Sequence, residues 1–186
     1  MYSDPKHIES SYNEHNIGSI MYDIVREHKP KKIVEFGVLY GYSTVAMAQA
    51  VRDNGIGNIK AYDLFEEYEY KNGVKEIVEH NLDFYDLKDK VTLDQTDFYA
   101  WLENPEPFDL LHFDISNDGV LIKLVKEKLS NQINNGAIVL FEGGGIIRDD
   151  VEWMVKYNKI KMNPLKDDLG FTVLSEEYPT ISKFNV

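Results

Sequence analysis

The segment that most constrains the fold of this chain runs from Lys32 to Val45 and reads KIVEFGVLYGYSTV. An apolar run carries an acid, Glu35, near its end, and a helical pattern begins a few residues later. Between them lie Gly37 and Gly41, which let the backbone approach a ligand where a Cβ would collide. The free N–H groups at the start of the helix carry partial positive charge and point at the same place. This order of strand, glycine loop and helix predicts the first turn of an open α/β sheet that holds a nucleotide-like cofactor.

Apolar stretches and helical patterns alternate along the rest of the chain. Continuous apolar runs at 109–113 and 137–141 are typical of strands that are covered on both faces in a parallel sheet. We predict strands over residues 32–36, 58–63, 90–94, 108–114 and 136–142. We predict helices over residues 16–28, 42–53, 73–85, 97–102, 118–133 and 146–157, the last with 149 as a second candidate start. Strands that alternate with helices give a Rossmann-like, doubly wound α/β fold with a mostly parallel sheet.

Local signals mark two helix starts and the C-terminal segment. Asn16 and Asp97 have side chains suited to cap the helices that follow them. Two β-prone runs, 171–174 and 180–184, are separated by a turn-like stretch and predict a C-terminal antiparallel hairpin. Residues 160–162 are an alternative sixth strand.

Composition and charge limit the class of protein. The chain has 186 residues and 43% hydrophobic content, enough for one substantial core, and no apolar run approaches the roughly 20 residues that span a bilayer. Its formal net charge of −12 disfavours nucleic acid and anionic membrane surfaces, which bind Lys and Arg. It has no cysteine, and its N-terminus lacks the pattern of a signal peptide. We therefore expect a single cytoplasmic domain whose partner is a small molecule, with no nucleic acid and no membrane.

Acids end four of the predicted strands, at Glu35, Asp63, Asp114 and Glu142, and Asp97 follows the third strand. Ligands in open α/β sheets bind outside the carboxyl ends of the strands, so these acids are expected around one site. Asp63 follows the glycine loop by about 20 residues, where related folds place a carboxylate that accepts hydrogen bonds from ribose hydroxyls. An alternative interpretation of any single acid is the solvated start of a loop. The occurrence of acids at four strand ends, together with the glycine loop, favours a site.

Four stretches of the chain resemble motifs of one enzyme family. The glycine loop reads E-x-G-x-x-x-G-x-S, with Leu39 in place of the second glycine of the dinucleotide pattern G-x-G-x-x-G. It resembles motif I of the class I S-adenosylmethionine-dependent methyltransferases. The run AYDLFE at 61–66 and the segments LLHFDISND at 110–118 and NGAIVLFE at 135–142 resemble the macrocin O-methyltransferase-like group of small-molecule O-methyltransferases. The resemblance covers about residues 33–142, and it implies the class I methyltransferase fold, which ends in an antiparallel pair of strands.

The resemblance also implies a division of the chain and a cofactor, S-adenosyl-L-methionine. Residues 1–186 would form one methyltransferase-like domain, with an N-terminal helical segment at 1–30, a cofactor-binding core at 31–142 and an acceptor-side part at 143–186. The residues implied at the methionine and ribose end of the cofactor are Glu35, Gly37, Tyr40, Gly41 and Ser43. Asp63 would bind the ribose, and the residues implied near the adenine are Leu64 or Phe65, Asp97 and Phe98. Asp114 would lie near the sulfonium and the methyl acceptor.

Asp114 and Glu142 are the catalytic candidates and also the candidate ligands of a metal ion. Some relatives bind Mg²⁺ with an acid after strand four and an acid pair after strand five, and carboxylate oxygens suit that ion. This chain has Gly143 in place of the second acid of the pair, and Asp118 is a candidate substitute. The three glycines at 143–145 predict a mobile floor beside the acceptor site.

Several assignments stay open on the sequence alone. His112 is either a general base or, as its apolar strand favours, a hydrogen-bonded structural histidine. Tyr40 and Tyr42 flank Gly41 and are expected near the cofactor pocket. The charged segment 63–75 is either a lid or, as its charge favours, a solvated loop.

The preferred function is methyl transfer from S-adenosylmethionine to a small molecule, with a hydroxyl group as the expected acceptor. The first alternative is a methyltransferase-fold protein that binds the cofactor or a nucleoside without transferring a methyl group, which the missing acid after Glu142 slightly favours. The second is a nicotinamide-dependent oxidoreductase, against which the absence of G-x-G-x-x-G counts. Only about 30 residues precede the first strand, so the acceptor is expected to be small or held partly by the second subunit of a homodimer.

Overall fold

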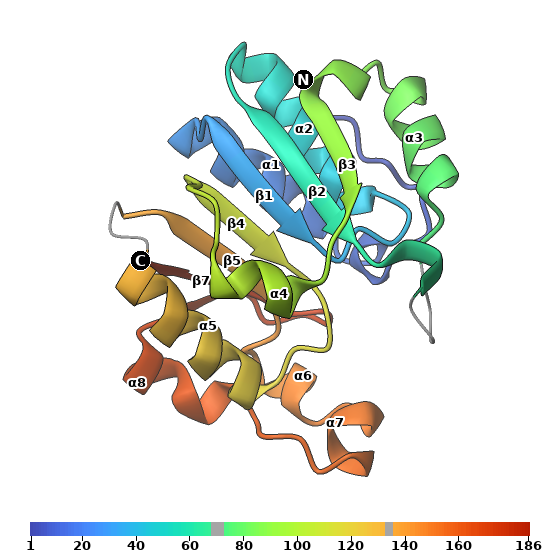
Figure 1. Ribbon diagram of the computed structural model, residues 1–186. Coiled ribbons are helices and arrows are strands. Elements are labelled where there is room, and N and C mark those ends of the chain that lie inside the picture. Colours follow the sequence, from blue (N-terminus) through green and yellow to red (C-terminus); the bar gives the residue numbers. More distant parts are fainter. Residues whose placement is uncertain (68–72, 133–135) are drawn as a thin grey trace.

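The computed structural model describes residues 1–67, 73–132 and 136–186. Within these ranges the chain forms a seven-stranded sheet in the order β3-β2-β1-β4-β5-β7-β6 (Figure 1). The strands are β1 (Lys32–Phe36), β2 (Asn58–Asp63), β3 (Val91–Gln95), β4 (Leu110–Phe113), β5 (Ile138–Glu142), β6 (Thr172–Ser175) and β7 (Ile181–Asn185). The predicted bounds of β1 and β2 are confirmed, and the other predicted strands agree to within two residues at each end.

The pairing of the strands places β1 inside the sheet, between β2 and β4. Strands β1 to β5 pair in parallel, and β7 runs antiparallel between β5 and β6. Ile33 pairs with Ile59 of β2 on one side and with Leu110 of β4 on the other. The strand order reverses between β1 and β4, and crevices for ligands form outside the carboxyl ends of the strands at such a point. The predicted doubly wound α/β fold with a C-terminal antiparallel hairpin is confirmed.

Helices cover both faces of the sheet (Figure 1). They are α1 (Ile17–His28), α2 (Tyr42–Asn54), α3 (Lys75–Phe84), α4 (Phe98–Glu103), α5 (Gly119–Gln132), α6 (Ile146–Asp149), α7 (Glu152–Lys156) and α8 (Lys166–Leu169). On one face α1 and α2 bury Met21 and Val45, and on the other α4 and α5 bury Trp101 and Val125. The central strands therefore lie between two apolar layers, which explains their continuous apolar runs. In the described ranges, no helix is long and apolar enough to cross a bilayer.

Three local predictions differ from the structure. Asn16 precedes α1 but makes no side-chain bond to it, because its own backbone is left-handed, with a φ of 50°. Residues 160–162 form no strand, since the N–H of Met162 donates to the carboxylate of Asp149 at 2.8 Å. The predicted helix at 146–157 is divided into α6 and α7. Asp97, by contrast, caps α4 through its side chain as predicted.

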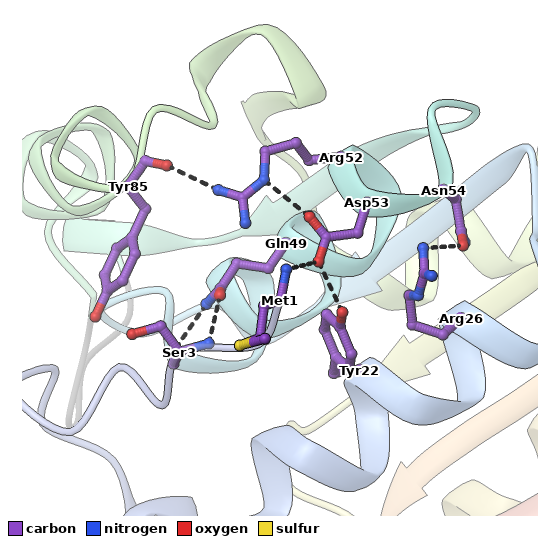
Figure 2. Close-up of polar contacts among 9 residues, drawn as sticks. All are labelled: Met1, Ser3, Tyr22, Arg26, Gln49, Arg52, Asp53, Asn54 and Tyr85. Atoms are coloured by element: carbon purple, nitrogen blue, oxygen red, sulfur yellow. Dashed lines mark hydrogen bonds and ion pairs between the residues drawn. The ribbon is translucent and has the colours of Figure 1, made fainter.

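The N-terminal segment is fastened to α2 and continues toward the carboxyl side of the sheet. Figure 2 shows that Ser3 and Gln49 exchange two hydrogen bonds of 2.8 Å, and that Tyr22 of α1 donates to Asp53 of α2 at 2.7 Å. A turn of 3₁₀ helix follows this anchor and buries Tyr12. These contacts fix the position of Tyr12 beside the site described next.

Candidate active site

A cavity of about 330 Å³ lies at the carboxyl ends of β1, β2 and β4. Its wall combines glycine backbone, apolar side chains and acids, which suits a ligand with both aromatic and polar parts. The predicted site residues that line it are Gly37, Asp63, Leu64, Asp97, Phe98 and Asp114. Residues that are far apart in the sequence are thus brought around one opening, as the strand-end argument predicts.

One wall of the cavity is the loop after β1, which depends on Gly37. Its φ of +83° is a left-handed conformation that residues with side chains rarely adopt. A Cβ at this position would lie 1.8 Å from the carbonyl oxygen of Asp114. The loop after β1 therefore packs directly against the end of β4, and this packing requires glycine at position 37.

Asp63 holds the shape of the same loop. Its Oδ2 accepts hydrogen bonds from the N–H groups of Val38 and Leu39 at 2.6 and 3.0 Å, and its Oδ1 accepts one from Phe65 at 2.9 Å. A carboxylate offers about four lone-pair sites, so capacity for a further donor remains. Asp63 also lines the cavity, which leaves the predicted contact with a ribose sterically accessible.

Four of the predicted cofactor residues lie outside the lining of this cavity, namely Glu35, Tyr40, Gly41 and Ser43. The Ser43 hydroxyl donates to Glu35 Oε1 at 2.5 Å, and both side chains are buried. Tyr40 packs against the core under α1 and α2, while its carbonyl accepts a hydrogen bond from Asn81 at 2.9 Å. A contact between these four residues and a cofactor stays a prediction.

Two aromatic candidates belong to the core. Of the two residues considered for the adenine, Leu64 lines the cavity, whereas Phe65 is buried in the core. Tyr42 is also buried, and its hydroxyl donates to Asp4 at 3.0 Å.

The segment 63–75, considered as a lid or a solvated loop, includes residues 68–72, which lie outside the described residues.

His112 is a structural histidine, as its apolar strand favours. It is fully buried, its Nδ1 lies 3.1 Å from Glu35 Oε1, and its Nε2 lies 3.4 Å from the hydroxyl of Tyr12. Burial, followed by the negative charge of Asp114, raises the pKa of Tyr12 well above its ordinary value. Sequence reasoning missed Tyr12, because nothing in the N-terminal segment signals that it packs under the end of β4.

Asp114 follows β4, and Glu142 is the last residue of β5. Because β4 and β5 pair in parallel, these two residues lie side by side. Burial, reinforced by the charge of Asp114, raises the pKa of Glu142 to about 8, and burial also raises the pKa of Asp114. Arg148 of α6 donates from Nε to Glu142 Oε1 at 2.5 Å. Sequence reasoning missed Arg148 too, although it is the only basic residue between Glu142 and Lys156.

The donor set of this chain does not fit the predicted Mg²⁺ site at Asp114 and Glu142. Among the described residues, no three His, Cys, Asp or Glu side chains gather as a metal site. One oxygen of Glu142 is paired with Arg148. The candidate substitute, Asp118, caps the first turn of α5 and pairs with Lys159 at 3.4 Å. Mg²⁺ prefers octahedral oxygen coordination that includes free carboxylates, which Glu142 and Asp118 do not offer here.

The glycine segment 143–145 is held in place, which corrects the prediction of a mobile floor. The N–H of Gly143 donates to the carbonyl of Thr180 at 2.7 Å, and its own carbonyl accepts from the Ser182 hydroxyl at 2.7 Å. A Cβ at Gly144 would lie 2.3 Å from Ser182 Oγ, and one at Gly145 would lie 2.5 Å from Thr180 Cγ2. These glycines therefore let the chain after β5 pack closely against β7.

The raised pKa of Glu142 predicts a pH dependence of stability. The folded chain binds more protons than the unfolded chain between the ordinary pKa of a glutamate and about 8, so stability falls as the pH rises through this window. We expect the free energy of unfolding to fall by about 1 kcal/mol per pH unit there, and Glu142→Gln to flatten the slope. Urea unfolding measured at several pH values checks this. An equal slope in Glu142→Gln would contradict it and would assign the slope to Asp114, whose pKa burial also raises, because acids with lowered pKa, such as Asp53 at about 2, act at lower pH.

Comparison with known proteins agrees with this geometry. Residues 34–150 match a protein-family profile described as a methyltransferase domain, and no curated protein matches the chain. The fold is similar to the O-methyltransferase TomG from Streptomyces achromogenes, involved in tomaymycin synthesis and solved with S-adenosylmethionine, at 14% identity and a TM-score of 0.66 over 98% of this chain and 89% of that one. It is also similar to an O-methyltransferase from Bacillus cereus in complex with S-adenosylhomocysteine, at 17% identity and a TM-score of 0.65 over 97% and 84% of the two chains. A methyltransferase from Geobacter sulfurreducens matches at 18% identity and a TM-score of 0.64 over 100% and 89%.

The sheet order and the cavity at the carboxyl ends of its strands define a class I methyltransferase fold. Because the profile covers residues 34–150, more than half of the chain, this chain belongs to that family of methyltransferase domains. The predicted family and enzyme class are confirmed. The alternative of a nicotinamide-dependent oxidoreductase is not supported.

Proposed function

We propose that this chain transfers a methyl group from S-adenosylmethionine to an oxygen of a small-molecule acceptor. The observation that carries the proposal is the cavity at the switch point of the sheet, which gathers the glycine loop, Asp63, Asp97 and Asp114. Membership of the methyltransferase family supports the same cofactor. Two similar structures were solved with S-adenosylmethionine or S-adenosylhomocysteine, which adds to this support.

The residues around the cavity fit this cofactor. Gly37 contributes backbone to the cavity wall, and Leu64 and Phe98 supply apolar surface for an adenine. Asp63 has lone pairs left for ribose hydroxyls, and Asp97, whose side chain also caps α4, lies at the same rim. When bound, S-adenosylmethionine supplies an electrophilic methyl group on a sulfonium, which an acceptor oxygen attacks in line as the C–S bond breaks and its electron pair goes to sulfur.

Asp114 is the residue that we assign to the acceptor. It lines the cavity and lies beside the buried Tyr12 and Glu142. Burial raises the pKa of Asp114, which strengthens its carboxylate as a base toward the proton of an acceptor hydroxyl. Tyr12 closes the space behind this carboxylate. Glu142 is then a positioning residue, since its oxygen is bound to Arg148.

The acceptor is proposed to be a small molecule for two reasons. The formal net charge of −12 disfavours a nucleic acid, and the cavity volume of about 330 Å³ lies in the range of small-molecule sites. A homodimer that completes the acceptor side, a cytoplasmic location and the division into segments 1–30, 31–142 and 143–186 stay predictions from the sequence.

Asp63→Asn is expected to weaken the binding of S-adenosylhomocysteine by about 10- to 100-fold. This factor corresponds to the loss of one hydrogen bond from a ribose hydroxyl to a charged acceptor. Asparagine keeps the size of the side chain and one acceptor oxygen for Val38 and Leu39, while its NH₂ then faces the N–H of Phe65. We therefore expect the fold to be retained with a lower free energy of unfolding. Calorimetric titration of both proteins with S-adenosylhomocysteine and S-adenosylmethionine, with NAD as a negative ligand, measures the effect.

Asp94→Asn is the matched control for this experiment. Asp94 lies on β3, next to β2, but it is exposed and does not line the cavity, so its substitution should leave the affinity unchanged. If the folded wild-type protein binds neither S-adenosylhomocysteine nor S-adenosylmethionine, the proposed function is wrong. Equal affinity in Asp63→Asn would remove Asp63 from the ribose site but leave the rest standing.

A further inference from the structure

An arginine side chain lies between the strand ends where the sequence led us to expect a metal ion. Arg148 is 7% exposed and donates from Nε to Glu142 Oε1 at 2.5 Å. Glu142 ends β5, and Asp114 follows the neighbouring strand β4. A guanidinium is therefore paired with Glu142, one of the two candidate metal ligands, and the other, Asp114, follows the neighbouring strand.

The environment of Arg148 keeps the guanidinium charged and in place. Burial opposes the charge, but the carboxylate of Glu142 raises the pKa of Arg148, and Asp114 acts in the same direction. The guanidinium carbon lies 5.3 Å from the ring centroid of Trp153, a cation–π distance. An arginine held on several sides in this way is a fixed cation rather than a mobile surface charge.

The positions that could add oxygen ligands for a divalent ion are unavailable. Gly143 has a φ of +113°, where residues with side chains are strained, and the Cε of Met162 lies 2.2 Å from the place of its Cβ. Asp118 accepts hydrogen bonds from Val120 and Leu121 at 3.0 Å and is committed to the start of α5. The chain thus has a built-in cation, and the residues that the structure describes supply no third carboxylate or imidazole ligand at the same edge.

We propose that the Arg148 guanidinium takes the place of a divalent metal ion beside Asp114 and Glu142, so that the acceptor side of this chain is ordered without a metal. The guanidinium compensates part of the negative charge of the two acids and fixes the side chain of Glu142. This inference deepens the proposed function. Only the measurement of S-adenosylhomocysteine binding, described below, depends on the proposed function; the measurements of Mn²⁺ binding do not.

The test is the response of the full chain to Mn²⁺, which binds the same oxygen ligands as Mg²⁺. Calorimetric titration with MnCl₂ and thermal unfolding with and without millimolar MnCl₂ are carried out on wild type, Arg148→Ala and Arg148→Lys. We expect no binding heat and no shift of Tm in the wild type and in Arg148→Lys, which retain a cation. In Arg148→Ala the two carboxylates lose their cation, so Mn²⁺ should bind them weakly, with water as its remaining ligands, and raise the Tm. Adding Glu142→Gln should abolish this rise.

Two outcomes would overturn the proposal. One is Mn²⁺ binding by the wild type that Glu142→Gln abolishes, which would mean that Arg148 moves aside for a metal. The other is a folded Arg148→Ala protein that shows neither Mn²⁺ binding nor a change of Tm. If Arg148→Ala does not fold, Arg148→Gln is measured in its place. The affinity of the wild type for S-adenosylhomocysteine should be equal in EDTA and in MnCl₂. Absence of that binding in both solutions contradicts the proposed function, while the Mn²⁺ response still decides the role of Arg148.

Discussion

Replacing Gly37 with alanine is expected to lower the free energy of unfolding by about 3–5 kcal/mol and to abolish binding of S-adenosylhomocysteine. The new Cβ would lie 1.8 Å from the carbonyl oxygen of Asp114, and a backbone atom cannot swing away as the end of a side chain can. The ends of β1 and β4 must therefore separate, which displaces Asp114 from the cavity wall. Urea unfolding gives the change in stability, and calorimetry gives the loss of binding.

Gly55→Ala is the matched control, because it separates backbone strain from the clash. Gly55 ends α2 with a φ of +68°, also left-handed, but a Cβ there would meet no atom within 4 Å. This substitution should cost only the strain of about 1 kcal/mol and leave binding unchanged. If Gly37→Ala and Gly55→Ala cost the same, the contact between the loop after β1 and the end of β4 is not what requires glycine at position 37.

The sequence was sufficient for the parts of the fold that depend on local pattern. Strands β1 and β2 were predicted to the residue because apolar runs that end near an acid are local signals, and the acids then mark where the strands open onto the site. The capping role of Asp97 followed from its side chain and its position alone. Parallel pairing then brought Gly37, Asp63 and Asp114 together without further information.

The parts that could not be predicted depend on how distant segments pack. Tyr12 reaches the end of β4 only because the N-terminal segment is anchored on α2, an arrangement that no periodicity encodes. Arg148 reaches Glu142 because the chain turns sharply at three glycines after β5. Glu35 has the right place in the motif, yet its Oε1 is bound to Ser43 and His112 inside the protein. The partners of Glu35 lie on a helix, α2, and on a neighbouring strand, β4, so the sequence pattern around Glu35 does not reveal them.

Replacing Arg148 with methionine is expected to cost about 1 kcal/mol more stability at about pH 9 than at about pH 6, because Glu142 must then either stay charged without a partner or keep its proton against the high pH. Methionine has a similar length and an apolar side chain, so the volume is largely retained and the charge is what changes. Glu142 has a pKa of about 8 with the arginine present, and removal of the cation raises it further. At about pH 6 the carboxyl group takes a proton in the folded state, so the cost should be smaller there.

The double variant Arg148→Met with Glu142→Gln identifies the cause of this loss. Glutamine carries no charge, so the double variant should recover most of the stability that Arg148→Met loses at about pH 9. Its stability should depend less on pH than that of Arg148→Met, with Asp114, whose pKa burial also raises, as the remaining buried acid. Urea unfolding of the four proteins of this cycle measures the coupling between the two side chains. Equal losses in the single and double variants would show that Arg148 stabilises the fold by packing, for example on Trp153, and not by its charge. Recovery, in contrast, would establish that the ends of β4 and β5 require a cation, as the replacement of a metal ion by Arg148 implies.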